Sequence, residues 1–139
     1  MKFLGIAIIA LSLVVGIAPQ FLDCQSQGKA ITLANGKTVP MKCHWTAIAE
    51  IGLAVPLAAT GGLSAFSKRK ETKRNLSIMG IILGAFVILM PTSLIGVCTS
   101  GMPCETVMKP LLILGGTLII VLSGILLFPT LRKGPDPEP

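Results

Sequence analysis

The chain has 139 residues, of which 52% are hydrophobic and only 13% are charged, and its mean hydropathy is +0.81. A soluble domain carries about a quarter charged residues, so this composition excludes an ordinary water-soluble domain. The net charge of +6 does not indicate a nucleic-acid partner, because the basic residues flank apolar blocks and the chain contains no Tyr.

The first apolar block runs from Phe3 to about Leu22. About 20 residues at a rise of about 1.5 Å each are enough to cross a hydrocarbon core of about 30 Å. A cleaved signal peptide is the alternative, since Lys2 precedes the apolar run. Pro19 would directly follow a cut after Ala18, and the apolar run continues past it. We therefore expect a retained helix.

Three further apolar blocks are each long enough to span a membrane, at about residues 46–66, 76–97 and 107–128. The sequence thus predicts an all-α membrane protein, with a single four-helix transmembrane domain over residues 1–131. The Pro-rich residues 132–139 are predicted to form a disordered cytoplasmic tail. Gly80 and Gly84 have the small-xxx-small spacing that lets two membrane helices approach closely.

The distribution of Lys and Arg predicts the orientation of these helices. Eight basic residues fall on one side: Lys2, Lys68, Arg69, Lys70, Lys73, Arg74, Arg132 and Lys133. Four fall on the other: Lys29, Lys37, Lys42 and Lys109. We therefore expect both termini and the basic segment 67–75 in the cytoplasm, with residues 21–45 and 98–106 outside the cytoplasmic membrane. Anionic lipid head groups are a secondary expectation for the basic segment.

All four cysteines fall in the two predicted outer loops: Cys24, Cys43, Cys98 and Cys104. An even number of thiols on the oxidising side of a membrane is typical of disulfide bonds. Three pairings are open, and the sequence does not choose among them. Local pairing within each loop is the simplest, whereas a bond such as Cys43 to Cys98 would tie the second helix to the third.

The first outer loop is predicted to contain a β-hairpin. Asn35-Gly36 is a strong two-residue turn signal, because both central positions of a type I′ turn require positive φ. That turn places Thr32 opposite Val39. An isolated hairpin is marginally stable, and a Cys24–Cys43 disulfide would staple it, contributing about 3 kcal/mol for a loop of this size.

Two alternatives give the cysteines a chemical role. A membrane thiol–disulfide oxidoreductase would exchange them, although the chain lacks the Cys-x-x-Cys pair that favours fast exchange. Extracytoplasmic zinc binding through the cysteines and His44 is the other, with copper(I) favoured if Met41 and Met102 contribute. The Cys-His spacing matches no common zinc motif, so we predict no cofactor and no metal.

The second span begins with a polar group of residues. Trp45 is expected at the membrane surface, where Trp rings anchor helices, and His44 beside it has no assigned role. Glu50 lies about 9 Å further along an ideal helix, at a depth where an ionised carboxylate costs roughly 3 kcal/mol. We expect Glu50 to contact Lys109 and so to hold the second and fourth helices together.

The whole pattern resembles an uncharacterised prokaryotic family of small four-helix membrane proteins, through "MKCHWTAIAE" at Met41–Glu50 and "GVC…MPC" at Gly96–Cys104. The resemblance implies a shared outer-face cluster: Met41, Cys43, His44, Trp45, Glu50, Cys98, Met102 and Cys104. It supplies no activity. Family members look like accessory proteins beside exporter-type ABC permeases.

The predicted function is therefore a non-enzymatic integral subunit or accessory protein of a larger membrane complex, with an ABC-type exporter as the candidate. Its expected partners are the lipid bilayer and other membrane subunits. No catalytic constellation is evident in the sequence, so no enzymatic activity is predicted.

Overall fold

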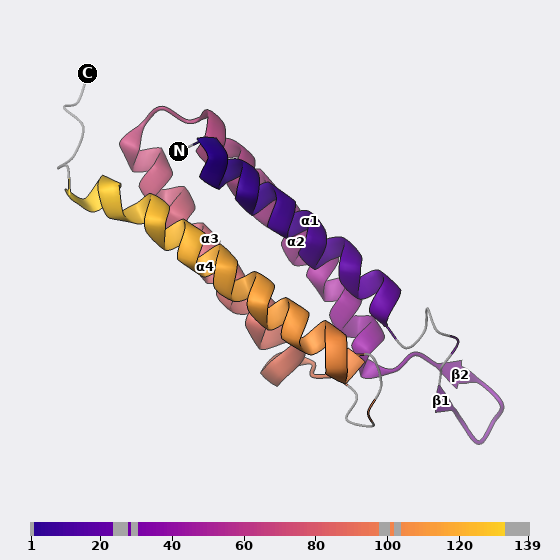
Figure 1. The fold of residues 1–139 in the computed structure, drawn as a ribbon. Coiled ribbons are helices and arrows are strands. Elements are labelled where there is room, and N and C mark those ends of the chain that lie inside the picture. Colours follow the sequence, from indigo (N-terminus) through magenta and orange to yellow (C-terminus); the bar gives the residue numbers. More distant parts are fainter. Residues whose placement is uncertain (1, 24–27, 29–30, 98–100, 102–103, 133–139) are drawn as a thin grey trace.

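A computed structural model describes residues 2–23, 28, 31–97, 101 and 104–132. Four long helices run side by side with alternating direction (Figure 1). In chain order the elements are α1 (Lys2–Leu22), β1 (Ile31–Thr32), β2 (Thr38–Val39), α2 (Lys42–Phe66), α3 (Lys70–Leu89), the π-helical turns η1 (Met90–Leu94) and η2 (Cys104–Met108), and α4 (Lys109–Arg132).

The two ends of the bundle differ in composition. We call one end the basic end; it holds the start of α1, the α2–α3 connection and the end of α4 (Figure 1). The opposite hairpin end carries β1 and β2, the start of α2 and the two π-helical turns (Figure 1). The tail at 133–139 lies outside the described residues.

In the described part of the chain, four helical segments are long and apolar enough to cross a membrane: Lys2–Leu22, Lys42–Phe66, Lys70–Leu94 and Cys104–Arg132. Only 33% of the most apolar window of each segment is buried in the bundle. The remaining residues of each window are partly or largely exposed in the described structure, which is the arrangement expected of apolar helices surrounded by lipid. The prediction of a four-helix membrane protein is thereby confirmed.

The helices extend beyond the predicted apolar blocks. Helix α2 begins at Lys42 rather than near residue 46, so Cys43, His44 and Trp45 lie in its first turn. Helix α3 begins at Lys70, and most of the predicted basic loop is its first two turns. The prediction was short because hydropathy detects only the apolar part of a helix, whereas Lys, Arg and Glu are good helix formers.

The third span also ends differently from the prediction. Its α-helix stops at Leu89 and continues as the π-helical turn η1, which contains the buried Pro91. Proline lacks the backbone N–H that a regular turn requires, and wider turns are one way a helix accommodates that loss. The predicted end near residue 97 therefore becomes a π-helical turn followed by irregular backbone.

Helix α1 packs mainly against α2, and α3 mainly against α4. Glycines allow these close approaches. A Cβ added to Gly116 would lie 2.8 Å from the carbonyl oxygen of Gly84, and one added to Gly5 would lie 2.8 Å from that of Gly61. This close contact confirms the predicted role of Gly84 in helix packing. Helices in hydrocarbon associate through such contacts because no hydrophobic effect acts between them.

The hairpin is present, but its register differs by one residue from the prediction. Ile31 pairs with Val39 and Thr32 with Thr38. Of the two predicted turn residues, only Gly36 has positive φ, at +79°. Beyond the two strands, the Leu33 N–H donates to the Lys37 carbonyl oxygen, so the loop itself is residues 34–36. The Gly36 N–H donates to the Leu33 carbonyl oxygen. A type I turn closed by a left-handed glycine explains the shift.

Candidate functional site

At the hairpin end, two of the four predicted cysteines enter one apolar cluster. Cys43 of α2 and Cys104 of η2 are both fully buried, and Met41 packs against the same cluster. The Cys104 thiol donates to the carbonyl oxygen of Leu22 at 3.2 Å, which ties η2 to the end of α1. Of the predicted outer-face cluster, Met41, Cys43 and Cys104 therefore meet in one apolar cluster, and the cluster as a whole stays a prediction.

The predicted disulfide bonds and the alternative of metal binding both involve residues outside the described part of the chain. Cys24, Cys98 and Met102 lie outside the described residues, and no disulfide bond occurs among the residues that are described. Within the described ranges, no three His, Cys, Asp or Glu side chains gather closely enough to hold a metal ion. The staple of the hairpin thus stays a prediction.

His44 has a partner that sequence reasoning missed. Its Nδ1 lies 2.9 Å from Oδ2 of Asp23, an acid that directly follows α1. The Asp23 side chain is 5% exposed and that of His44 is 24% exposed. This contact fixes the end of α1 to the first turn of α2. The acid and the imidazole are 21 residues apart, and no local spacing rule connects them.

Trp45 is exposed beside the Asp23–His44 contact. Its ring is 54% exposed and meets the His44 ring edge-on, with 6.0 Å between centroids. An exposed Trp in the first turn of a spanning helix has the location that an interfacial anchor requires. The anchoring role stays a prediction.

Two further hydrogen bonds join the helices near this end. The Thr46 hydroxyl donates to the carbonyl oxygen of Gly96 at 2.9 Å, which connects α2 to the backbone after η1. The Gln20 amide donates to the carbonyl oxygen of Ala47 at 2.7 Å, which connects α1 to α2. Both carbonyls are backbone atoms that no sequence motif identifies.

Glu50 is fully buried, as its position in the apolar block predicts. Neither carboxylate oxygen has a hydrogen-bond partner in the described part of the protein. The predicted contact with Lys109 is not formed. Lys109 begins α4 and is partly exposed, whereas Glu50 lies about 12 Å along α2 from its start. The two side chains thus lie in different environments, one fully buried and one partly exposed.

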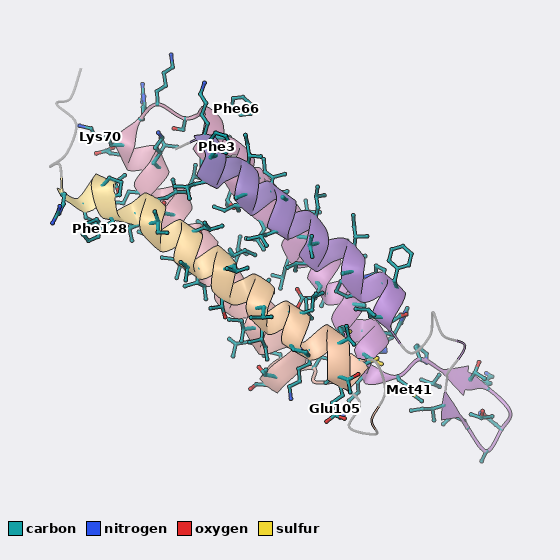
Figure 2. All side chains as sticks on the ribbon, viewed as in Figure 1. Phe3, Met41, Phe66, Lys70, Glu105 and Phe128 are labelled. Atoms are coloured by element: carbon teal, nitrogen blue, oxygen red, sulfur yellow. The ribbon has the colours of Figure 1, made fainter. Side chains whose placement is uncertain are left out.

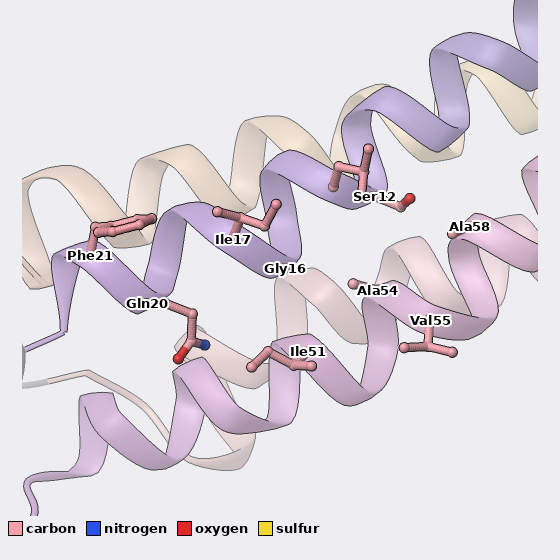
Figure 3. A pocket seen from close by; sticks show the side chains of 10 residues that line it. Ser12, Gly16, Ile17, Gln20, Phe21, Ile51, Ala54, Val55 and Ala58 are labelled. Atoms are coloured by element: carbon pink, nitrogen blue, oxygen red, sulfur yellow. The ribbon is translucent and has the colours of Figure 1, made fainter.

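A second candidate site lies on the outer surface of the α1 and α2 pair (Figure 3). We call this cavity the α1–α2 groove; its volume is about 450 Å³. Small residues line it on both helices: Ser12, Gly16, Ala54 and Ala58. A Cβ added to Gly16 would lie 2.7 Å from the Cβ of Ala54, so the two backbones are already in tight contact there.

Large apolar side chains form the sides of this groove. Ile17 is 54% exposed and Val55 is 67% exposed, and Figure 3 shows them on opposite helices of the groove. Its accessible lining is apolar. The Ser12 hydroxyl is already bonded to the Ile9 carbonyl oxygen at 2.7 Å. The groove therefore offers shape and dispersion contacts rather than groups that bind a polar substrate.

Comparison with known proteins gives one match. A family model described as "Domain of unknown function (DUF4418)" matches residues 4–129, which covers all four helices. No curated protein and no solved structure matches the chain.

Proposed function

We propose that this chain, which belongs to the DUF4418 family, is a non-enzymatic integral membrane subunit. It packs against a transmembrane helix of a larger membrane protein. An ABC-type exporter is the candidate complex that the family resemblance suggests. The observation that carries the proposal is the apolar α1–α2 groove with its small residues.

The groove suits a helix for a physical reason. Lipid tails are as apolar as Leu, so helices in a membrane associate through close packing rather than through the hydrophobic effect. Small residues such as Gly16, Ala54 and Ala58 permit that close packing. At one end of the groove the Gln20 amide donates to the Ala47 carbonyl oxygen at 2.7 Å, which holds α1 and α2 together.

An adjacent pair of alanines provides a matched test. Ala58 lines the groove, whereas Ala59 is exposed and does not line it. Tagged wild-type, Ala58→Leu and Ala59→Leu chains would be purified from native membranes and their bound proteins quantified by mass spectrometry. We expect one integral membrane protein at near-stoichiometric yield with wild type and Ala59→Leu, and its loss with Ala58→Leu. Equal yields from all three chains contradict the proposal.

The orientation proposed for this subunit places both termini in the cytoplasm and the cysteine-bearing loops outside the membrane. Charge supports it. Seven described basic residues lie at the basic end: Lys2, Lys68, Arg69, Lys70, Lys73, Arg74 and Arg132. Three lie at the hairpin end: Lys37, Lys42 and Lys109. Positive residues are retained on the cytoplasmic side.

We further propose that the outer loops are held by structural disulfides that resist exchange. The rival function, thiol–disulfide exchange, requires a thiol that a substrate can reach. Cys43 and Cys104 are 0% exposed, which opposes that function. Thiol counting on the purified protein discriminates the two: disulfides that survive mild reductant support a structural role, and a readily exchanged pair supports the oxidoreductase.

A further inference from the structure

A cavity of about 520 Å³ opens at the basic end, between the start of α1, the end of α2 and the first turn of α3. We call it the basic cavity. Its lining is Lys2, Ala65, Phe66, Ser67, Lys68 and Lys73. Figure 2 shows the neighbouring Phe3, Phe66 and Lys70 gathered at this end of the bundle.

The lining of the basic cavity is strongly cationic. Its three lysines come from three separate segments of the chain, and none of the described residues that line it is acidic. Glu71 belongs to the first turn of α3, but its side chain is exposed and lies outside the lining. Three lysines lining one cavity favour an anion with more than one charge-bearing oxygen, such as a phosphate.

The start of α3 adds to this preference. Its N-cap residue is Arg69, which makes no side-chain cap hydrogen bond. The N-terminus of a helix carries a partial positive charge from the aligned peptide dipoles. A residue such as Asp or Ser would normally occupy the cap position. A basic cap instead increases the positive potential beside the cavity, and an anion bound there would offset it.

The remaining lining indicates which anion the cavity suits. Ala65 and Phe66 complete the apolar span of α2. The Phe66 side chain is 85% exposed and that of Phe3 is 87% exposed, both at the end of a candidate span. Phe rings are wholly apolar, so these two extend the apolar surface of the spans up to the cationic lining. The cavity thus joins a cationic half to an apolar half at the membrane surface.

We propose that the basic cavity binds the phosphate-bearing head group of an anionic phospholipid. The phosphate lies among Lys2, Lys68 and Lys73, and the acyl chains continue along the apolar end of α2. A zwitterionic lipid is disfavoured because its own ammonium group would meet three others. The inference is independent of the α1–α2 groove, since the two cavities share no lining residue.

Native mass spectrometry on the full chain, titrated with phosphatidylglycerol or with phosphatidylcholine of the same acyl chains, tests this proposal. We compare Lys68→Gln/Lys73→Gln with Arg74→Gln/Arg132→Gln. The control removes the same charge from the same end of the bundle but leaves the cavity lining unchanged. Each lysine that contacts the head group should contribute roughly fivefold in affinity for an anionic lipid. A charge outside the cavity should contribute less, because solvent and salt screen it.

We expect phosphatidylglycerol affinity to fall roughly 25-fold in the cavity variant and by less than about threefold in the control. Wild type should bind phosphatidylcholine at least tenfold more weakly. Equal losses in the two variants overturn the proposal, as does equal binding of the two lipids. Inorganic phosphate that displaces the lipid at equal concentration would reassign the site to free phosphate. If the double variant does not fold, Lys68→Gln alone must still weaken binding about fivefold.

Discussion

The buried carboxylate of Glu50 gives the sharpest prediction about stability. Both oxygens are inaccessible and without a hydrogen-bond partner in the described part of the protein. Each buried polar group left unsatisfied costs about 1–3 kcal/mol. Glu50→Met removes both oxygens and keeps a flexible side chain of similar length, which adapts to the surrounding packing. We expect the free energy of unfolding to rise by about 2 kcal/mol.

Unfolding of the detergent-solubilised chain, followed by circular dichroism during titration with sodium dodecyl sulfate, measures this change. Glu71→Met is the control, because Glu71 is an exposed acid on α3, and its replacement should change stability by less than about 0.5 kcal/mol. A loss of more than about 1 kcal/mol in Glu50→Met would refute the reasoning, since it would reveal a stabilising partner. A double-mutant cycle with Lys109→Met should give a coupling energy near zero, and one above about 1 kcal/mol would restore the sequence-based pair.

Three further predictions follow from the packing, the hairpin end and the charges. Gly116→Ala should lower the free energy of unfolding by about 1–3 kcal/mol, because its Cβ would meet the Gly84 carbonyl oxygen at 2.8 Å. Gly124→Ala is the control, because the space around its Cβ is open. This control should leave the free energy of unfolding unchanged or raise it by about 1 kcal/mol. A cycle of Asp23→Asn and His44→Gln should give a coupling energy of about 1 kcal/mol, and a value near zero would mean that the 2.9 Å contact does not stabilise the protein. Green fluorescent protein fused to the C-terminus should fluoresce in cells, whereas alkaline phosphatase fused there should be inactive; active phosphatase would reverse the proposed orientation.

The four-helix architecture was predictable because long apolar blocks have few alternatives in a membrane. The tight contact at Gly84 was also predictable, since small residues at this spacing have a direct packing consequence. The ends of the helices were not, because residues outside the apolar blocks also adopt helix: residues 42–45 in α2 and the charged first turns of α3. The hairpin register was missed by one residue because Asn35-Gly36 fits both a two-residue type I′ loop and a three-residue loop in which only the glycine has positive φ.

The contacts that join the helices were the least predictable part of the site. The Asp23–His44 pair and the Thr46–Gly96 bond each depend on how separate helices rotate about their axes. Similar depth in the sequence assigned Glu50 to Lys109, but the Glu50 oxygens have no hydrogen-bond partner among the described residues. The α1–α2 groove likewise arises from the relative position of Gly16 and Ala54, which belong to different helices.

Photo-crosslinking in native membranes tests most directly whether a partner helix docks in the α1–α2 groove. A benzophenone amino acid would replace Val55, an exposed groove residue, or Leu114, which is 65% exposed on α4 and does not line the groove. We expect one discrete adduct with an integral membrane protein from position 55, abolished by Ala58→Leu, and no such adduct from position 114. Lipid adducts alone from position 55, or the same protein adduct from both positions, would contradict it.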